Sequence, residues 1–212
     1  MTLHSEALME RVRAVVLAAG QGKRMHSDLP KVLHLLCGQP LLTYVLDALA
    51  AAGIARPLVV VGHGAEGVRT TAGGGVEFIE QREQLGTGHA VIQALPRLEG
   101  GSGPVLVLYG DTPLLQPEAI HALLDLHRSS GAAATMLTAA LDDPSGYGRI
   151  IRGSSGAVAR IVEEADATPD EARLREINAG TYVFEPRALA AGLEALTPAN
   201  TQKEYYLTDT IG

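Results

Sequence analysis

Apolar and polar residues follow one another along the chain in blocks that predict strands and helices in turn. Apolar runs typical of buried strands lie at 14–18, 58–61, 76–80, 105–109 and 133–140. Helical patterns lie between them at 41–52, around 87–95, and at 117–130. This alternation predicts an α/β fold, Rossmann-like, with a mixed, mostly parallel sheet and helices on both faces. Ligands bind beyond the carboxyl ends of the strands in such sheets.

The pattern changes after Asp142, so we divide the chain into a first half at about 12–140 and a second half at about 141–212. The second half is expected to contain short strands at 146–150 and 157–162, a polar stretch at 166–175, a strand at 179–184 and a helix at 186–196. A further helix is expected to begin near Glu204. It has no stop signal before Gly212, so we expect the chain to be truncated at its C-terminus.

Composition indicates an ordinary globular protein. Hydrophobic residues make up 46% of the 212 and charged residues 19%. No apolar run approaches the roughly 18 residues of a membrane span. The N-terminus carries Glu6 and Glu10 and no hydrophobic signal core, so export is not expected. The single cysteine, Cys37, can form no internal disulfide, which fits a cytoplasmic protein, and we predict that it is a small buried residue.

The charge distribution favours a small anionic ligand over a polymer. The formal net charge of −7 argues against nucleic acid as a partner, because nucleic-acid binders usually present a basic face. Between residues 23 and 31, however, Lys23, Arg24 and Lys31 outnumber the single anion Asp28. A small basic patch in an acidic protein suits a polyphosphate.

A glycine-rich loop follows directly on the first predicted strand. Residues 17–25 read Leu-Ala-Ala-Gly-Gln-Gly-Lys-Arg-Met, and small residues there let backbone N–H groups approach a phosphate. Met25 replaces the third glycine of a dinucleotide fingerprint, and no Gly-Lys-Ser/Thr follows, so the loop is neither that motif nor a P-loop. Such a turn alone is as often structural as functional. Arg24, with planar paired donors, and Lys31, a point charge, favour phosphate binding.

Two further strings follow predicted strands. Residues 81–90 read Gln-Arg-Glu-Gln-Leu-Gly-Thr-Gly-His-Ala: a turn into a helix, or a base-recognition loop in which an amide both donates and accepts hydrogen bonds. Residues 109–113 read Tyr-Gly-Asp-Thr-Pro. Asp111 there is either a turn cap or a ligand for Mg²⁺, which usually takes one or two protein carboxylates.

Together these strings resemble the uridylyltransferase part of the bacterial bifunctional N-acetylglucosamine-1-phosphate uridylyltransferase/glucosamine-1-phosphate acetyltransferase family. Many nucleotidyltransferases share the loop at 17–25, and Leu-Pro-Lys-Val-Leu at 29–33 narrows the resemblance. Gly-Tyr-Gly-Arg-Ile, Ile-Val-Glu, Glu-Ile-Asn-Ala-Gly and Glu-Tyr-Tyr-Leu-Thr-Asp, at 146–150, 161–163, 176–180 and 204–209, resemble later family segments. The resemblance begins near Val12, with mild departures at Ala179 and Lys203.

The resemblance implies a nucleotide site, a sugar site and a metal ligand. It assigns Arg24 and Lys31 to catalysis and Asp111 to Mg²⁺. The nucleotide-binding residues that it implies are Leu17, Ala18, Ala19, Gly20, Gly22, Lys31, Gln81, Gly86, Thr87, Tyr109, Gly110 and Asp111. The sugar-binding residues that it implies are Gly148, Glu163, Asn178, Tyr206 and Thr208.

The implied reaction joins UTP to N-acetyl-α-D-glucosamine 1-phosphate, giving UDP-N-acetylglucosamine for cell-wall synthesis and pyrophosphate. The attacking phosphate oxygen is already anionic, so no general base is required, and His34, His63 and His89 are expected to be structural. The family supplies a second metal ligand, an asparagine, and an acetyltransferase β-helix that forms trimers. Both are expected to lie beyond Gly212, and the chain without them is expected to be monomeric.

Three alternatives remain. A cytidylyl- or thymidylyltransferase would share the loop at 17–25, but the strings at 81–90 and 176–180 argue against it. A non-catalytic nucleotide-sugar binding module would be expected to lack Arg24, Lys31 or Asp111, and all three are present. A purely structural domain leaves the three motifs that follow strands unexplained.

Overall fold

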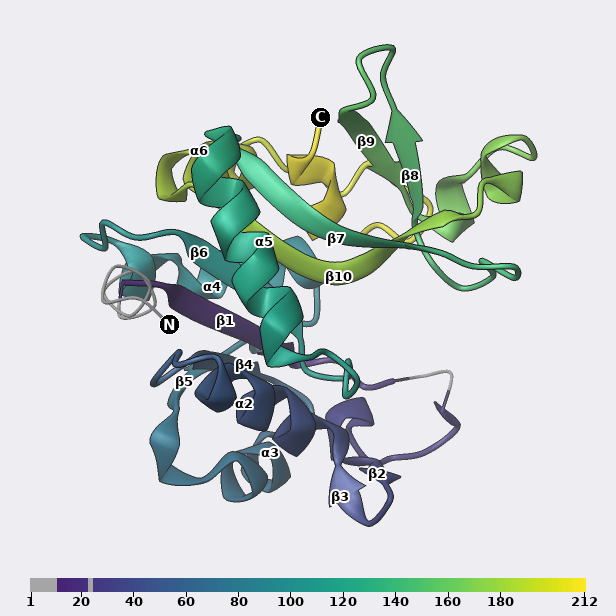
Figure 1. Ribbon diagram of the computed structural model, residues 1–212. Helices are drawn as coiled ribbons and strands as arrows, with labels where there is room; N and C mark the ends of the chain where they lie inside the picture. The colour runs from purple at the N-terminus through teal and green to yellow at the C-terminus, as the bar shows by residue number, and fades with distance from the viewer. Residues whose placement is uncertain (1–10, 23–24) are drawn as a thin grey trace.

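The computed structural model describes residues 11–22 and 25–212 of the chain. Within them, one eight-stranded sheet has the order β5-β4-β1-β6-β10-β8-β9, and β7 pairs with β10 (Figure 1). The strands are β1 (Arg13–Ala18), β4 (Leu58–Val61), β5 (Glu77–Glu80), β6 (Val105–Tyr109), β7 (Ala134–Ala140), β8 (Arg149–Arg152), β9 (Val158–Val162) and β10 (Glu176–Phe184). The first four are parallel, and β10 is antiparallel to its neighbours, so the predicted α/β fold with a mixed sheet is confirmed.

Helices cover both faces of the sheet. The helices are α2 (Leu41–Ala51), α3 (Ala65–Ala72), α4 (Thr87–Leu98), α5 (Pro117–Ser130) and α6 (Pro186–Glu194). Because successive strand residues point to opposite faces, Val16 of β1 joins the core beneath α2, α3 and α5, whereas Val15 joins the core beneath α4 and α6. No helix in the described ranges is long and apolar enough to cross a membrane.

The strand order indicates a ligand site beyond the carboxyl ends of the central parallel strands. The chain passes outward from β1 to β4 and β5, and then returns to the other side of β1 with β6. The strand order therefore reverses at β1, and ligands in such sheets bind at this reversal, beyond the carboxyl ends of the strands. The glycine-rich loop follows β1 there, and Asp111 follows β6.

Strand β10 carries an irregularity that opens the sheet. Along one side of β10, residues 181–184 pair with β6, whereas Ile177 pairs with Arg149 of β8. Its register against β7 shifts between Asn178 and Tyr182, and Gly180 has a φ of +72°. Such bulges re-aim side chains and are frequent beside active sites. The break separates β6 from β8, and residues 178–180 line a cavity there although Asn178 and Gly180 are largely buried.

A short hairpin of two strands corrects the prediction made for Cys37. Strands β2 (Leu35–Leu36) and β3 (Gln39–Pro40) form a hairpin, and its turn residues Cys37 and Gly38 have φ values of +51° and +85°. A two-residue hairpin turn with both φ values positive projects its residues from the hairpin. Cys37 is therefore exposed, and the prediction that it is buried was wrong.

The helix predicted to begin near Glu204 is also absent from the structure. Tyr205 instead pairs with the loop before α4: its N–H donates to the Leu85 carbonyl, and its carbonyl accepts from the Gly88 N–H, both at 2.7 Å. Backbone groups committed to another segment cannot make helical hydrogen bonds. Only a short 3-10 turn at Leu207–Thr210 follows.

Candidate active site

A cavity of about 320 Å³ opens where the two halves of the chain meet. Residues of both halves line it. The predicted site residues that line it are Lys31, Thr87, Tyr109, Asp111, Gly148, Glu163, Asn178 and Tyr206. The structure thus brings together eight residues that lie between positions 31 and 206 of the sequence.

A cation and an anion meet at the floor of this cavity. Lys31 begins a 3-10 turn at Lys31–Leu33, Asp111 follows β6, and their side chains form an ion pair. Gly22 lies against Lys31, because a Cβ on Gly22 would be 2.7 Å from that of Lys31. The glycine-rich loop and the lysine are therefore adjacent in space, as a phosphate site requires. Arg24, the other predicted catalytic cation, lies outside the described residues.

The remaining loop residues lie at the carboxyl end of β1. The Gly110 N–H donates to the Leu17 carbonyl at 2.9 Å, which joins the loops after β1 and β6. Ala18 and Ala19 are buried, whereas Gly20 is exposed, and a Cβ there would meet nothing within 4 Å. The backbone at Gly20 is therefore open to an approaching ligand, which backbone N–H groups of such a loop can bind.

Tyr109 joins the two halves at the centre of the site. Its ring lies against Gly180 of the β10 bulge, where any Cβ would be 2.5 Å from a ring carbon. Burial, with the Glu163 carboxylate adding to it, raises the pKa of Tyr109 to about 12. The phenol is therefore neutral at physiological pH. It can donate a hydrogen bond to a ligand but cannot act as a base.

Glu163 faces the cavity from the end of β9, and two neighbours set its position. Its Oε1 accepts a hydrogen bond of 2.9 Å from the hydroxyl of Thr208 in the C-terminal turn. Its Oε2 lies 3.3 Å from the position that a Cβ on Gly148 would take. Thr208 is 1% exposed and does not line the cavity. The structure therefore places this predicted sugar-binding residue behind Glu163.

Asn178 lines the cavity at the β10 bulge, and its side chain also closes that bulge. Its Nδ2 donates to the Tyr182 hydroxyl at 2.5 Å, and its Oδ1 accepts from the Gly180 N–H at 3.0 Å. Burial raises the pKa of Tyr182 well above its usual value, so this hydroxyl stays neutral. The amide is therefore held in one orientation before any ligand arrives.

The predicted base-binding string lies beside the cavity. Gln81 is buried, and its amide nitrogen donates to the Gly86 carbonyl and lies 3.0 Å from His89 Nδ1. Gly86 allows a close approach, but to the C-terminal segment: a Cβ there would be 2.5 Å from the Tyr205 carbonyl oxygen. Thr87 both lines the cavity and accepts a hydrogen bond from the Leu207 N–H. Base contacts by Gln81 and Gly86 stay a prediction.

Sequence reasoning missed several cavity residues. They are Thr112, Gly146, Tyr147, Ala179, Gly180, Gln202 and Glu204. Most flank residues that the motifs had identified, so adjacency in the sequence is the signal that could have found them. Gln202 and Glu204 reach the cavity only because residue 205 pairs with the loop before α4, which no local pattern indicates.

The donor set at Asp111 fits a magnesium ion bound mainly through a ligand's phosphates. Mg²⁺ usually takes one or two carboxylates, keeps several waters and binds substrate phosphate oxygens. Asp111 offers such a carboxylate at the cavity, and it is only 18% exposed. In the described part of the chain, no three His, Cys, Asp or Glu residues form a closed metal centre. A metal held by protein ligands alone therefore fits these residues poorly.

Comparison with known sequences relates the chain to nucleotidyltransferases. The profile of the family described as "MobA-like NTP transferase domain" matches residues 14–206. The chain is 54% identical over 203 residues to the "Bifunctional protein GlmU" of Heliobacterium modesticaldum, covering 96% of this chain and 44% of that protein. It is 50% identical to that of Listeria welshimeri over the same shares. The chain thus spans less than half the length of these relatives and matches their N-terminal part.

Comparison with solved structures supports the fold. A crystal structure described as UDP-glucose pyrophosphorylase complexed with UDP-glucose superposes with a TM-score of 0.74, covering 93% of this chain and 84% of that one. The sequence identity is 18%, so the likeness concerns the arrangement of strands and helices. The predicted nucleotidyltransferase fold is therefore confirmed.

Proposed function

Because the chain belongs to the family of MobA-like NTP transferase domains, we propose that it transfers uridylyl from UTP to N-acetyl-α-D-glucosamine 1-phosphate. One observation carries the proposal: the Lys31–Asp111 pair and the side chains of Glu163 and Asn178 line one cavity. A phosphate-binding cation, a carboxylate suited to Mg²⁺ and hydrogen-bonding groups suited to a sugar thus converge. Relatives at 50–54% identity carry the name bifunctional GlmU, which supports the choice of substrates.

The reaction needs charge neutralisation more than acid–base chemistry. An oxygen of the sugar 1-phosphate attacks the α-phosphorus of UTP, one P–O bond forms, and the bond to the departing pyrophosphate breaks. The nucleophile is already anionic, so the neutral phenol of Tyr109 is not required as a base. Lys31 is placed to neutralise phosphate charge, and a preorganised cation of this kind stabilises the transition state without reorganisation.

The sugar-facing residues would orient the nucleophile. Glu163 accepts hydrogen bonds, so it suits sugar hydroxyl groups, and the Asn178 amide suits the acetamido group. Both are held before the sugar arrives, Glu163 by Thr208 and Asn178 by Tyr182 and Gly180. Such positioning lowers the entropic cost of bringing the two phosphates together.

Asp111 would hold Mg²⁺ in this proposal. The bound ion would neutralise charge on the reacting phosphates. Lys31 already lies against the same carboxylate, so this chain's own cation would add to the charge neutralisation that the ion would supply. No other described residue needs to ligate the ion, since Mg²⁺ keeps waters and phosphate oxygens in its shell.

The first test is pyrophosphate release from UTP and N-acetylglucosamine 1-phosphate with Mg²⁺, with CTP, dTTP and glucose 1-phosphate in parallel. Release confined to UTP with the N-acetylated sugar supports the proposal. Release with another pair supports a related nucleotidyltransferase instead. No release from any pair, with binding of UDP-N-acetylglucosamine retained in calorimetry, would identify a binding module.

Asp111→Ala sharpens this test. We expect the loss of magnesium-dependent turnover, by about 10²-fold or more, because a preorganised charge at the reacting phosphates is removed. Asp125→Ala is the matched control, because Asp125 pairs with Arg128 on the exposed face of α5 and does not line the cavity. Full activity of Asp111→Ala would remove this residue as the metal ligand.

A further inference from the structure

A buried arginine beside the cavity has no role in the reaction as described so far. Arg149, the first residue of β8, is 2% exposed, although arginine is seldom fully buried unless it is paired. A buried guanidinium is costly to desolvate, and its donors must be satisfied. What it contacts therefore shows what it holds in place.

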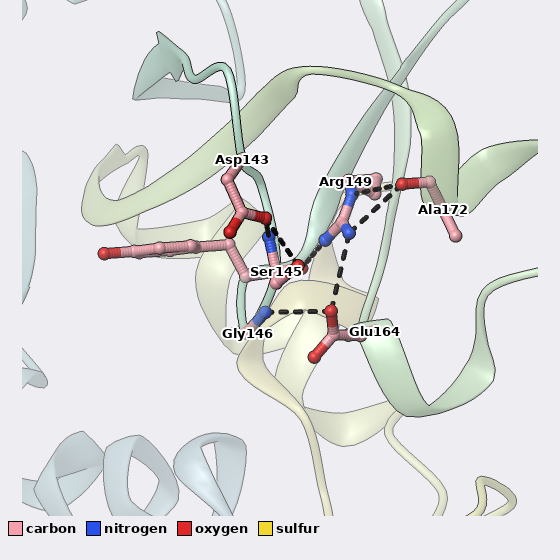
Figure 2. A network of polar contacts seen from close by, with 7 residues as sticks. Asp143, Ser145, Gly146, Arg149, Glu164 and Ala172 are labelled. Carbon is pink, nitrogen blue, oxygen red and sulfur yellow. Dashed lines mark hydrogen bonds and ion pairs between the residues drawn. The ribbon is translucent and has the colours of Figure 1, made fainter.

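The Arg149 guanidinium joins three separate segments (Figure 2). Its Nη1 donates to the Tyr147 carbonyl. Its Nε and Nη2 donate to the Ala172 carbonyl at 3.3 and 3.2 Å. Its Nη2 also lies 3.5 Å from the Glu164 carboxylate. One side chain thus fixes the loop before β8, the 3-10 turn after β9 and the 3-10 turn before β10.

The Glu164 carboxylate completes the connection to the cavity wall. Its Oε1, the oxygen that faces Arg149, also accepts a hydrogen bond of 2.8 Å from the Gly146 N–H. Gly146, Tyr147 and Gly148 all line the cavity. Adjacent carboxylates thus serve different purposes: Glu163 faces the cavity, whereas Glu164 turns away from it to hold the loop.

The Gly148 backbone transmits this arrangement to the sugar-facing groups. Its carbonyl accepts a hydrogen bond of 2.9 Å from the Asn178 N–H. The position of its missing Cβ is 3.3 Å from Glu163 Oε2. A shift of the loop would therefore move the wall against which Glu163 and Asn178 are set.

We propose that Arg149 and Glu164 are positioning residues that hold the loop 144–148 as the sugar-side wall of the cavity. Neither side chain is placed to touch substrate, and both act through the backbone of Gly146 and Tyr147. The inference deepens the proposed function and rests on it, because the loop is assigned to the acceptor sugar 1-phosphate rather than to the nucleotide.

The experiment compares five variants of the protein by steady-state kinetics and by amide hydrogen exchange of the peptide that covers 144–148. Arg149→Met removes all donors, and Arg149→Lys keeps a charge that can reach part of the acceptors. Glu164→Ala removes the acceptor of the Gly146 N–H, whereas Glu164→Gln keeps one. Arg152→Met is the matched control. Arg152 lies on the same strand as Arg149, and the substitution breaks its pair with Glu176 of β10, away from the cavity.

We expect Arg149→Met and Glu164→Ala to raise the KM for the sugar 1-phosphate about ten-fold, because small displacements of positioning groups are costly. The KM for UTP should stay within about two-fold of the wild-type value, because the substitutions leave the contacts to the nucleotide unchanged. Exchange in 144–148 should accelerate in both variants. Glu164→Gln and Arg152→Met should keep wild-type kinetics and exchange, and Arg149→Lys should lie between.

The outcomes separate the inference from the proposed function. An unchanged KM for the sugar 1-phosphate in Glu164→Ala, or an equal rise in Arg152→Met, overturns the positioning role. If the wild-type protein transfers no nucleotide, the proposed function fails, and the exchange data alone decide whether Glu164 holds the loop. If Arg149→Met does not fold, the Glu164 pair still decides, because Glu164 is half-exposed and its replacement leaves the core intact.

Discussion

The two halves of the molecule support the cavity in different ways. In the first half, β4 and most of β6 are fully buried, and helices pack on both faces of the strands. In the second half, the β8–β9 hairpin exposes most of its residues, whereas β10 is largely buried in the sheet. The buried Arg149 and hydrogen bonds to Glu163 and Asn178 hold the cavity wall there. Apolar burial orders the strands of both halves, whereas polar contacts hold the cavity wall that the second half provides.

This contrast indicates a division of labour within the site. A sheet buried on both faces is a rigid support, which suits the proposed roles of Lys31 at the phosphates and of Asp111 as the metal ligand. A wall held by hydrogen bonds can match the shape of one sugar, and the loss of one hydrogen bond typically costs only about 1 kcal/mol. Stability and sugar recognition should therefore respond to different substitutions.

The largest effect is expected from the buried sheet. Leu106 of β6 is fully buried in the core beneath α2 and α5. Leu106→Ala should lower the free energy of unfolding by about 2–5 kcal/mol, through lost burial and the cavity that remains. Leu126 on α5 is 56% exposed, so Leu126→Ala is the control and should change the free energy of unfolding by less than about 0.5 kcal/mol. Urea unfolding of both variants measures the difference.

The core variant Leu106→Ala should leave sugar recognition intact. At a temperature where Leu106→Ala remains folded, both KM values should equal those of the wild-type protein. A rise in the KM for the sugar 1-phosphate as large as that expected for Glu164→Ala would contradict the contrast. It would show that the wall depends on the core beneath the first half.

An intermediate effect is expected at the joint between the halves, where Tyr109 meets Tyr182 and Gly180. An unfolded tyrosine ionises near pH 10, whereas burial raises the pKa of Tyr109 to about 12. The unfolded state therefore loses its proton first as the pH rises. The stability that the neutral phenol provides is complete below pH 10 and is lost between about pH 10 and 12, on the order of 3 kcal/mol at most.

Urea unfolding at pH 8, 10 and 11 checks this expectation. Tyr109→Phe should lose less stability over that range than the wild-type protein, because one of the groups that must ionise on unfolding is gone. Tyr182 also has a raised pKa, so some dependence on pH should persist. Equal slopes in the two proteins would show that the Tyr109 phenol does not couple folding to pH.

The first half could be predicted from the sequence almost element by element. Strands such as β4 and β6 are continuous apolar runs, and α5 begins at Pro117 and ends before Gly131, so local pattern sufficed. Helix α3 was missed, because its exposed face and Gly67 weaken the apolar repeat. The convergence of Lys31, Asp111, Glu163 and Asn178 also followed from the motifs, since their resemblance to a known family carries tertiary information.

The second half could be predicted only in outline. The helix expected near Glu204 fails because the Tyr205 backbone pairs with the distant loop at 85–88. The roles of Arg149 and Thr208 depend on partners 15 to 45 residues away, which no local periodicity reveals. Long-range polar contacts are therefore what local sequence reasoning lacks, and here they hold the wall that we propose faces the sugar.

The smallest effect should arise at the contact between the C-terminal turn and Glu163. Thr208→Val keeps the shape of the side chain but removes the hydroxyl that donates to Glu163 Oε1. We expect the free energy of unfolding to fall by about 1 kcal/mol, the usual net value of one hydrogen bond, and the KM for the sugar 1-phosphate to rise a few-fold. Thr208→Ser retains the hydroxyl and should keep the wild-type KM in the same assay.

If Thr208→Val and Thr208→Ser behaved alike, the lost methyl packing or the altered volume would explain both, and Glu163 would have to be held by its other neighbours. If Val alone raised the KM while stability changed by only about 1 kcal/mol, one hydrogen bond would tune sugar recognition almost independently of folding, as the contrast between the halves requires.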